Sequence, residues 1–180
     1  IGLVVFTTLL GLAMGYNISN MSDSTEGSTK NDTSLMPDGS GKIAKRGNDL
    51  KPSDFVHLHN HTYHSVLDGL TKVDELAAKV KEFGMEAAAV TDHGTLSGVL
   101  DYYKAAKAEG IKPILGIETY VAARSRFDRD PSKDKQRFHL TVLAMNNQGY
   151  QNLMKLSTRA NLEGMYYKPR VDHDLLEELN

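Results

Sequence analysis

The sequence predicts an α/β fold in which strands and helices alternate from about residue 54 onward. Two observations support it. Short apolar runs that are typical of strands start near residues 55, 87, 111 and 138, and helical apolar spacing occupies the intervals between the first three. The strand starts recur every 24 to 32 residues, which is the length of one strand–helix unit. We therefore expect a parallel sheet or a barrel.

The individual elements follow from local patterns. Strands are expected at residues 55–60, 87–91, 111–117 and 138–145, where apolar residues either alternate with polar ones or form a continuous run. The first helix is expected to begin after Thr71 as its N-cap and to end at Gly84, because apolar positions between them recur at three and four residues. Further helices are expected at 96–108 and 148–162, and Asp172 has the position of another N-cap.

Composition limits the classes of function. The chain has 180 residues, enough for one domain with a buried core, and its formal net charge of -2 gives no global signal for nucleic-acid binding. There is no cysteine, so the sequence excludes disulfides and a thiolate zinc site. Every histidine lies after residue 56, which indicates that the chain has two unlike parts.

The first part comprises an apolar segment at residues 1–16 and a polar stretch at 17–53, which we expect to be a disordered linker before the domain at 54–180. The apolar segment has three interpretations: the remainder of a membrane or signal segment, ordinary coding sequence, or upstream sequence joined to a gene that starts at Met21 or Met36. We favour the last of these, and expect a cytoplasmic protein without membrane association.

A polar insert precedes the fourth expected strand. Residues 124–137 contain six basic and three acidic side chains. This composition is typical of a solvated loop, and alternatively of a surface that contacts DNA phosphates or a partner domain.

The first expected strand carries a histidine pair. His59 and His61 are two residues apart, so their side chains point to the same face of an extended strand. Two neighbouring neutral imidazoles form a clamp for Zn, Mn or Fe. The pair alone is a moderate signal for a metal site.

Further candidate ligands follow the expected strands. Asp92 and His93 come directly after the second strand and Glu118 ends the third, whereas His139 lies early in the fourth and Asp68 in a loop. Taken singly, Asp92 could cap a helix, Glu118 could be a solvated charge, His139 a core histidine and Asp68 part of a turn. Because the strand ends of an α/β barrel open on one face, their coincidence favours one metal site.

The remaining histidines carry weaker signals. His57 shares the face of the pair but stands near the strand's beginning, so we expect a structural role or a contact with a ligand. His64 stays ambiguous, and His173 is assigned no function.

Several motifs together resemble a known family. They are FVHLHNHTYHSVLDG, AVTDHG, GIKPILGIETYVA, FHLTVLAMNNQGYQNLMKLSTRANLEG and YYKPRVD, which span residues 54–180. The first two are similar to motifs of PHP (polymerase and histidinol phosphatase) domains in general. The others resemble more specifically the N-terminal region of bacterial DNA polymerase III alpha subunits, the C-family replicative polymerases.

The resemblance implies a distorted seven-stranded β/α barrel, of which about four strand–helix units would be present, with a cluster of up to three metal ions. It implies metal ligands at His59, His61, Asp68, His93, Glu118 and His139, with Glu118 bridging two ions. Asp92 would orient a ligand rather than bind the metal. The later ligands of the family, including an Asp-x-His motif, are not found in this sequence, so we expect a fragment of a longer protein.

The resemblance also implies a function. The parent would be a nucleotidyltransferase that uses Mg, DNA and dNTPs, with a sliding clamp and a proofreading subunit as partners, and with its polymerase active site outside this sequence. The metal-binding part would support 3′–5′ exonuclease or pyrophosphatase activity. Two alternatives stay open: a stand-alone metal-dependent phosphoesterase similar to histidinol phosphatase, and a non-catalytic, metal-stabilised scaffold.

Overall fold

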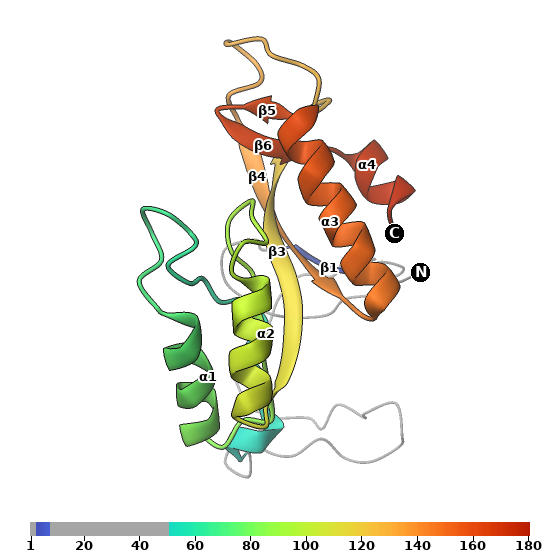
Figure 1. Cartoon of the computed structure of the whole chain (residues 1–180). Coiled ribbons are helices and arrows are strands. Elements are labelled where there is room, and N and C mark those ends of the chain that lie inside the picture. Colours follow the sequence, from blue (N-terminus) through green and yellow to red (C-terminus); the bar gives the residue numbers. More distant parts are fainter. Residues whose placement is uncertain (1–2, 8–50) are drawn as a thin grey trace, which may run out of the picture. The chain divides into compact units, whose positions relative to one another are not determined.

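The computed structural model describes residues 3–7 and 51–180, shown in colour in Figure 1. Its helices are α1 (Val73–Glu82), α2 (Val99–Ala108), α3 (Asn147–Leu162) and α4 (His173–Glu178), besides a short 3-10 turn at Pro52–Asp54. Its strands are β1 (Leu3–Thr7), β2 (Ala87–Val90), β3 (Lys112–Ala122), β4 (Arg137–Ala144), β5 (Met165–Tyr166) and β6 (Lys168–Val171). Most of the apolar segment 1–16 and of the linker expected at 17–53 lies outside the described residues.

The strand β3 is the centre of the sheet. It pairs in parallel with β2 and β6 and antiparallel with β4, whose other edge pairs with β1. The fold is therefore α/β as expected, but the sheet is mixed rather than wholly parallel. The reason is that residues 123–136 form no helix that would carry the chain back across the sheet, so β4 returns directly beside β3.

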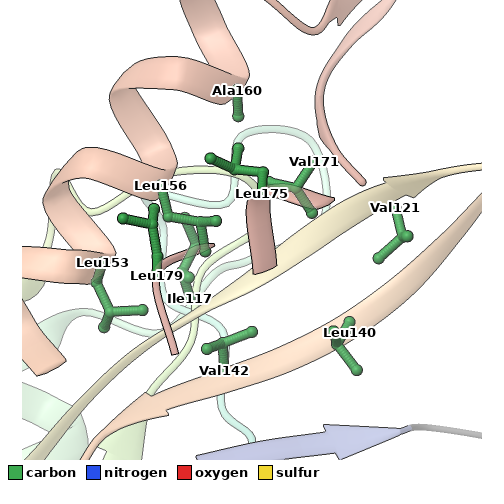
Figure 2. Close-up of a cluster of buried hydrophobic side chains, with 10 residues drawn as sticks. All are labelled: Ile117, Val121, Leu140, Val142, Leu153, Leu156, Ala160, Val171, Leu175 and Leu179. Carbon is green, nitrogen blue, oxygen red and sulfur yellow. The ribbon is translucent and has the colours of Figure 1, made fainter. Parts of the chain in front are cut away.

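Strand alternation divides the residues of β3 between two faces of the sheet. Ile117 and Val121 point towards α3, where they join buried side chains of β4, α3 and α4, drawn in Figure 2. The core side chains of α3 are Leu153, Leu156 and Ala160. Glu118 and Tyr120 alternate with these positions and therefore face the other way. One face of β3 thus anchors the core and leaves the other available for a site.

A second core lies between α1, α2 and β2, and the two helices lie side by side in Figure 1. Four alanine-sized or β-branched residues make β2 fully buried, as its apolar run predicts. Tyr102 of α2 donates a hydrogen bond from its hydroxyl to the carbonyl of Ala88, 2.8 Å away. Burial raises the pKa of Tyr102 to about 12, so this hydroxyl keeps its proton. The bond fixes α2 against the strand that leads into the histidine-rich loops.

The polar insert expected at residues 124–137, whose last residue begins β4, is held to the domain by ion pairs. Arg124 pairs with Asp134 at 2.7 Å, and Arg126 pairs with both Asp172 and Glu163. Behind them, the buried Arg170 guanidinium donates hydrogen bonds to four backbone carbonyls, those of Arg126, Asp128, Asp134 and Gly164. These contacts occupy the guanidinium groups of Arg124, Arg126 and Arg170 and hold the insert in a defined structure.

Some expected boundaries were wrong. Thr71 does not cap α1, which begins at Val73 after Lys72 without a side-chain cap. The Thr71 carbonyl instead accepts a hydrogen bond from Tyr63 N, which holds Thr71 in the preceding loop. The strand expected at 55–60 is an extended segment with a single bridge, His57 to Ala88. By contrast, Gly84 follows α1 with φ 70°, and the Asp172 side chain caps α4 by accepting from Leu175 N, as expected.

Two features were not expected from the sequence. The hairpin of β5 and β6 turns at Tyr167, a non-glycine residue with φ 61°. Residues 3–7 form β1, in register with β4 from Leu3 opposite Ala144 to Thr7 opposite Leu140.

Among the described residues, no helix combines the length and the apolar character that a membrane crossing requires.

Candidate metal centre

The centre of the candidate site is the carboxylate of Glu118 in the middle of β3, which is 4% exposed. Its Oε2 atom contacts the Nε2 atoms of His59 and His61, at 2.7 Å for His61. Its Oε1 atom lies 2.5 Å from Nδ1 of His139 and 3.6 Å from Nδ1 of His93. One buried carboxylate therefore divides four imidazoles between its two oxygens.

The histidine pair is positioned by the extended segment that runs beside β2. Ala89 N donates to the carbonyl of His57 at 2.7 Å, and Thr91 N donates to that of Asn60 at 2.9 Å. The Asn60 amide also donates to the carbonyl of Ala89. These hydrogen bonds hold the backbone at His57 and Asn60. The Nε2 atoms of His59 and His61 lie 3.1 Å apart. Both side chains therefore point to the same side of the segment, as their spacing predicts.

His93 follows β2 and is drawn to β3 by backbone contacts. It forms an isolated bridge with Glu118, and the next residue, Gly94, donates its N–H to the Glu118 carbonyl. On its outer side, His93 Nε2 lies 2.9 Å from a carboxylate oxygen of Asp68. Asp68 comes from an exposed loop in which Leu67 adopts φ 85°, a conformation that is uncommon outside glycine. The loop thus brings a second carboxylate to His93.

Asp92 has a different environment and is 2% exposed. It accepts hydrogen bonds from Thr62 N at 2.6 Å and from the Ser65 hydroxyl at 3.0 Å. The same Ser65 oxygen accepts from His93 N. Asp92 does not cap α2, which begins later, at Val99. Its contacts instead join the loop after His61 to the backbone of His93.

The antiparallel pairing of β4 explains the unusual position of His139. In the register of β3 and β4, Tyr120 is opposite His139, two positions along the ladder from the pair of Glu118 and Thr141. A residue early in β4 therefore lies beside one in the second half of β3. For a parallel β4 the same position would have been at the opposite end of the sheet. His139 joins the other candidates for this reason.

The electrostatics of the cluster favour an ionised Glu118 and a neutral His93. Burial tends to raise the pKa of Glu118, but the hydrogen bonds from His59 and His61 and the nearby histidines outweigh it and hold that pKa well below its ordinary value. The hydrogen bond to Glu118 raises the pKa of His61, so a proton can substitute there for a metal cation. Burial lowers the pKa of His93, which keeps this imidazole neutral.

The donor set fits divalent metal ions. Three groups of ligand atoms each lie within 4.8 Å of one another: His59, His61 and Glu118; His61, Asp68 and His93; and His93, Glu118 and His139. The groups overlap at shared residues, as a cluster of ions requires. In addition, the buried Nδ1 atom of His93 has no hydrogen-bond partner among the described residues. Neutral imidazoles and carboxylates without cysteine suit Zn, Mn or Fe.

Other residues near the site have supporting positions. The Tyr120 ring stacks on His93 with 5.8 Å between ring centroids and contacts His139 edge-on. Thr62, Ser65 and Tyr120 were not identified from the sequence, although the two-residue spacing of Tyr120 from Glu118 was a usable signal. His57 packs against Phe55, and its carbonyl helps hold the segment of the histidine pair. His173 begins α4 and belongs to none of the three ligand groups.

The fold and the cluster define an α/β domain with a histidine–carboxylate centre suited to divalent metals. The chain belongs to the PHP domain family, whose model matches residues 57–180. This match confirms the family resemblance inferred from the motifs.

The chain is also similar to larger proteins. The DNA polymerase III subunit alpha of Aquifex aeolicus is 54% identical over 131 residues, which cover 69% of this chain and 11% of that protein. That of Thermus aquaticus is 54% identical over 128 residues, covering 69% and 10%. The chain thus spans about a tenth of these relatives. A solved amidohydrolase from Chromobacterium violaceum superimposes with a TM-score of 0.40 at 20% identity, covering 59% of this chain and 34% of that one.

Proposed function

We propose that the cluster around Glu118 binds divalent metal ions, Zn, Mn or Fe, and supports hydrolysis of phosphoesters. The observation that carries this proposal is the division of four imidazoles between the two oxygens of one buried carboxylate. Each oxygen has its own histidines, so Glu118 can serve two ions at once. His59, His61, Asp68, His93 and His139 would complete the ligand set, and Asp92 would orient the loop that carries them.

The residues of the chain would prepare the reaction in three ways. Glu118 keeps its negative charge because its pKa is low, and thereby offsets the charge of bound cations. His93 is neutral and presents Nδ1 towards the cluster. Asp92 and Ser65 hold the backbone of His93 in place. When bound, a divalent metal supplies Lewis acidity towards a phosphoryl oxygen and towards the attacking water. No nucleophilic side chain is required.

We further propose that this chain serves as the N-terminal PHP portion of a replicative DNA polymerase. The sequence similarity to polymerase subunits from two organisms supports it. The whole protein would be a cytoplasmic nucleotidyltransferase that uses Mg, DNA and dNTPs and works with a sliding clamp and a proofreading subunit. The PHP portion would add 3′–5′ exonuclease or pyrophosphatase activity. A stand-alone phosphoesterase is less favoured, because these relatives are several times longer than a single domain.

The test compares metal content and hydrolysis in matched variants. The purified chain is loaded with Mn²⁺ or Zn²⁺, its bound metal is measured by elemental analysis, and hydrolysis of p-nitrophenyl phosphate and of a DNA 3′ end is followed. The double variant His59→Ala/His61→Ala should lose both metal and hydrolysis. His173→Ala removes an imidazole that belongs to none of the three ligand groups and should retain both.

The outcomes separate the alternatives. Hydrolysis that persists at the wild-type rate in the double variant would show that the metal site is wrongly assigned. Stoichiometric metal binding by the wild-type chain without hydrolysis of either substrate would replace the phosphoesterase proposal with the non-catalytic scaffold.

A further inference from the structure

A cavity of about 450 Å³ opens beside the candidate metal centre. Two of the proposed ligands, Asp68 and His93, form part of its wall. The rest of the wall includes polar groups that the proposed metal site does not use: His64, Thr95, Ser97 and Lys168. A cavity that combines metal ligands with unused hydrogen-bond donors and a cation is arranged to receive a polar, negatively charged ligand.

Lys168 is a cation without an acidic partner among the described residues. Its ammonium group lies 5.5 Å from the centre of the Tyr120 ring, and that ring stacks on His93. The guanidinium of Arg137, which also has no carboxylate partner in the described part of the chain, lies 5.8 Å from the same ring centre. Lys168 is therefore next to the candidate metal centre and still has its charge available, unlike Arg124 and Arg126 of the polar insert.

The loop after His93 contributes hydroxyl groups to the same cavity. The Thr95 hydroxyl donates to the Ser97 hydroxyl at 3.0 Å and accepts from Ser97 N at 3.1 Å. Ser97 Oγ lies 3.3 Å from Nδ1 of His64, whose buried Nε2 has no partner within the described residues. These exposed hydroxyls exchange bonds mainly with one another, so they can turn to a bound oxyanion at small cost.

We propose that this cavity binds the phosphoryl oxygens of the substrate that do not react, with Lys168 as the principal cation and Thr95 and Ser97 as donors. The inference rests on the proposed phosphoesterase function and names its substrate chemistry. Phosphate oxygens need cations that neighbouring carboxylates have not neutralised, and Lys168 meets this condition. The phosphoryl group can come from a phosphomonoester or from the end of a DNA strand.

Binding is measured first without catalysis. Inorganic phosphate is titrated with the Mn²⁺-loaded chain, and the paramagnetic broadening of its ³¹P resonance gives the Kd. Lys168→Met should raise this Kd about tenfold or more, since it removes a charge-assisted hydrogen bond. Lys168→Arg should restore most of the binding. Lys155→Met, which removes an exposed lysine on α3, is the matched control and should not change the Kd. Metal content should be equal in all four proteins.

Kinetics then identify the source of the phosphate. KM is compared for p-nitrophenyl phosphate and for a single-stranded oligonucleotide. A rise in KM for Lys168→Met with either substrate supports the proposal and shows which source the cavity accepts. Equal phosphate affinities for Lys168→Met and Lys155→Met would overturn the proposal, as would a wild-type chain that binds Mn²⁺ but leaves the ³¹P resonance unchanged. Phosphate binding through Lys168 without hydrolysis would retain the subsite and refute the phosphoesterase.

Discussion

The domain contains two buried clusters of charged and polar side chains that differ in how their charges are matched. In one, Arg126 lies between Asp172 and Glu163, at 2.8 and 2.7 Å, and each carboxylate has a cation. In the other, Glu118 faces four imidazoles, and no lysine or arginine of the described residues pairs with it. The charges of the first cluster balance within the chain, whereas a bound cation would balance those of the second.

This difference distinguishes buried charges that stabilise the fold from buried charges that are suited to binding a ligand. A buried charge is costly unless it is paired and hydrogen-bonded, and Arg126 and Asp172 meet both conditions from within the chain. Around Glu118 the histidines supply hydrogen bonds but only part of the compensating charge. A divalent cation would supply the remainder, so the folded state and the bound metal should stabilise each other.

The largest effect should come from breaking the cluster in which charges are matched, Arg126 with Asp172 and Glu163, which we call the matched cluster. Arg126 is 6% exposed, and Arg126→Met leaves Asp172 without its cation. We expect a loss of about 3–5 kcal/mol in the free energy of unfolding, measured by urea denaturation. The control is Arg129→Met, which removes an exposed arginine that contacts carbonyls only. If Arg126→Met costs no more than this control, the cluster does not depend on its charge balance.

Metal binding should have the next largest effect, at the cluster of Glu118 and its four histidines, which we call the unmatched cluster. Mn²⁺ or Zn²⁺ at a hundred times its Kd should raise the free energy of unfolding of the wild-type chain by about 2.7 kcal/mol, because the metal binds the folded state. Glu118→Gln should abolish this increase, while the exposed control Glu177→Gln should retain it. Thermal melts with metal and with chelator measure both. A metal-dependent shift that survives in Glu118→Gln would place the metal elsewhere.

Acid should weaken the matched cluster through Asp172. Burial tends to raise the pKa of Asp172, but hydrogen bonds from Arg126 N, Leu175 N and the Arg126 guanidinium lower it below its ordinary value of 3.8. Because the folded pKa is depressed, its contribution to stability is present above pH 3.8 and is lost as the pH falls through the folded pKa.

Asp172→Asn should therefore be less stable at pH 7 and should lose less stability than the wild type on acidification. Urea denaturation at a series of pH values measures the slope of the free energy of unfolding. Asp174→Asn, at an exposed position of α4, is the control. Parallel slopes for wild type and Asp172→Asn would contradict the depressed pKa.

The sequence predicted most of the unmatched cluster because its parts are local patterns. The spacing of His59 and His61 gives their common face, and Asp92, His93 and Glu118 could be placed from the apolar strands around them. The meeting of His139 with these residues could be expected only from resemblance. It depends on the antiparallel pairing of β4 with β3, which no local pattern specifies. The direction of β4 was accordingly the main error in the expected sheet.

The matched cluster could not be predicted in the same way. Arg126 and Asp172 are 46 residues apart in sequence, and their contact depends on how the polar insert folds back onto β6 and α4. Composition showed only that the insert was basic. Only the tertiary structure shows which arginines pair with carboxylates. It also shows that Lys168 does not. Local patterns therefore identified most of the candidate ligands, and packing decided which charges remain available.

The smallest effect is expected at the exposed margin of the matched cluster. Arg159 pairs with Glu178 at 2.7 Å, but the Glu178 side chain is 57% exposed, so water solvates either partner when the other is removed. Glu178→Gln should leave the melting temperature unchanged within the error of replicate melts, at both low and high salt. A decrease comparable to that of Arg126→Met would show that burial does not distinguish the two ion pairs. An unchanged melt, beside a large loss in Arg126→Met, would establish that stability comes from the desolvated Arg126–Asp172 pair.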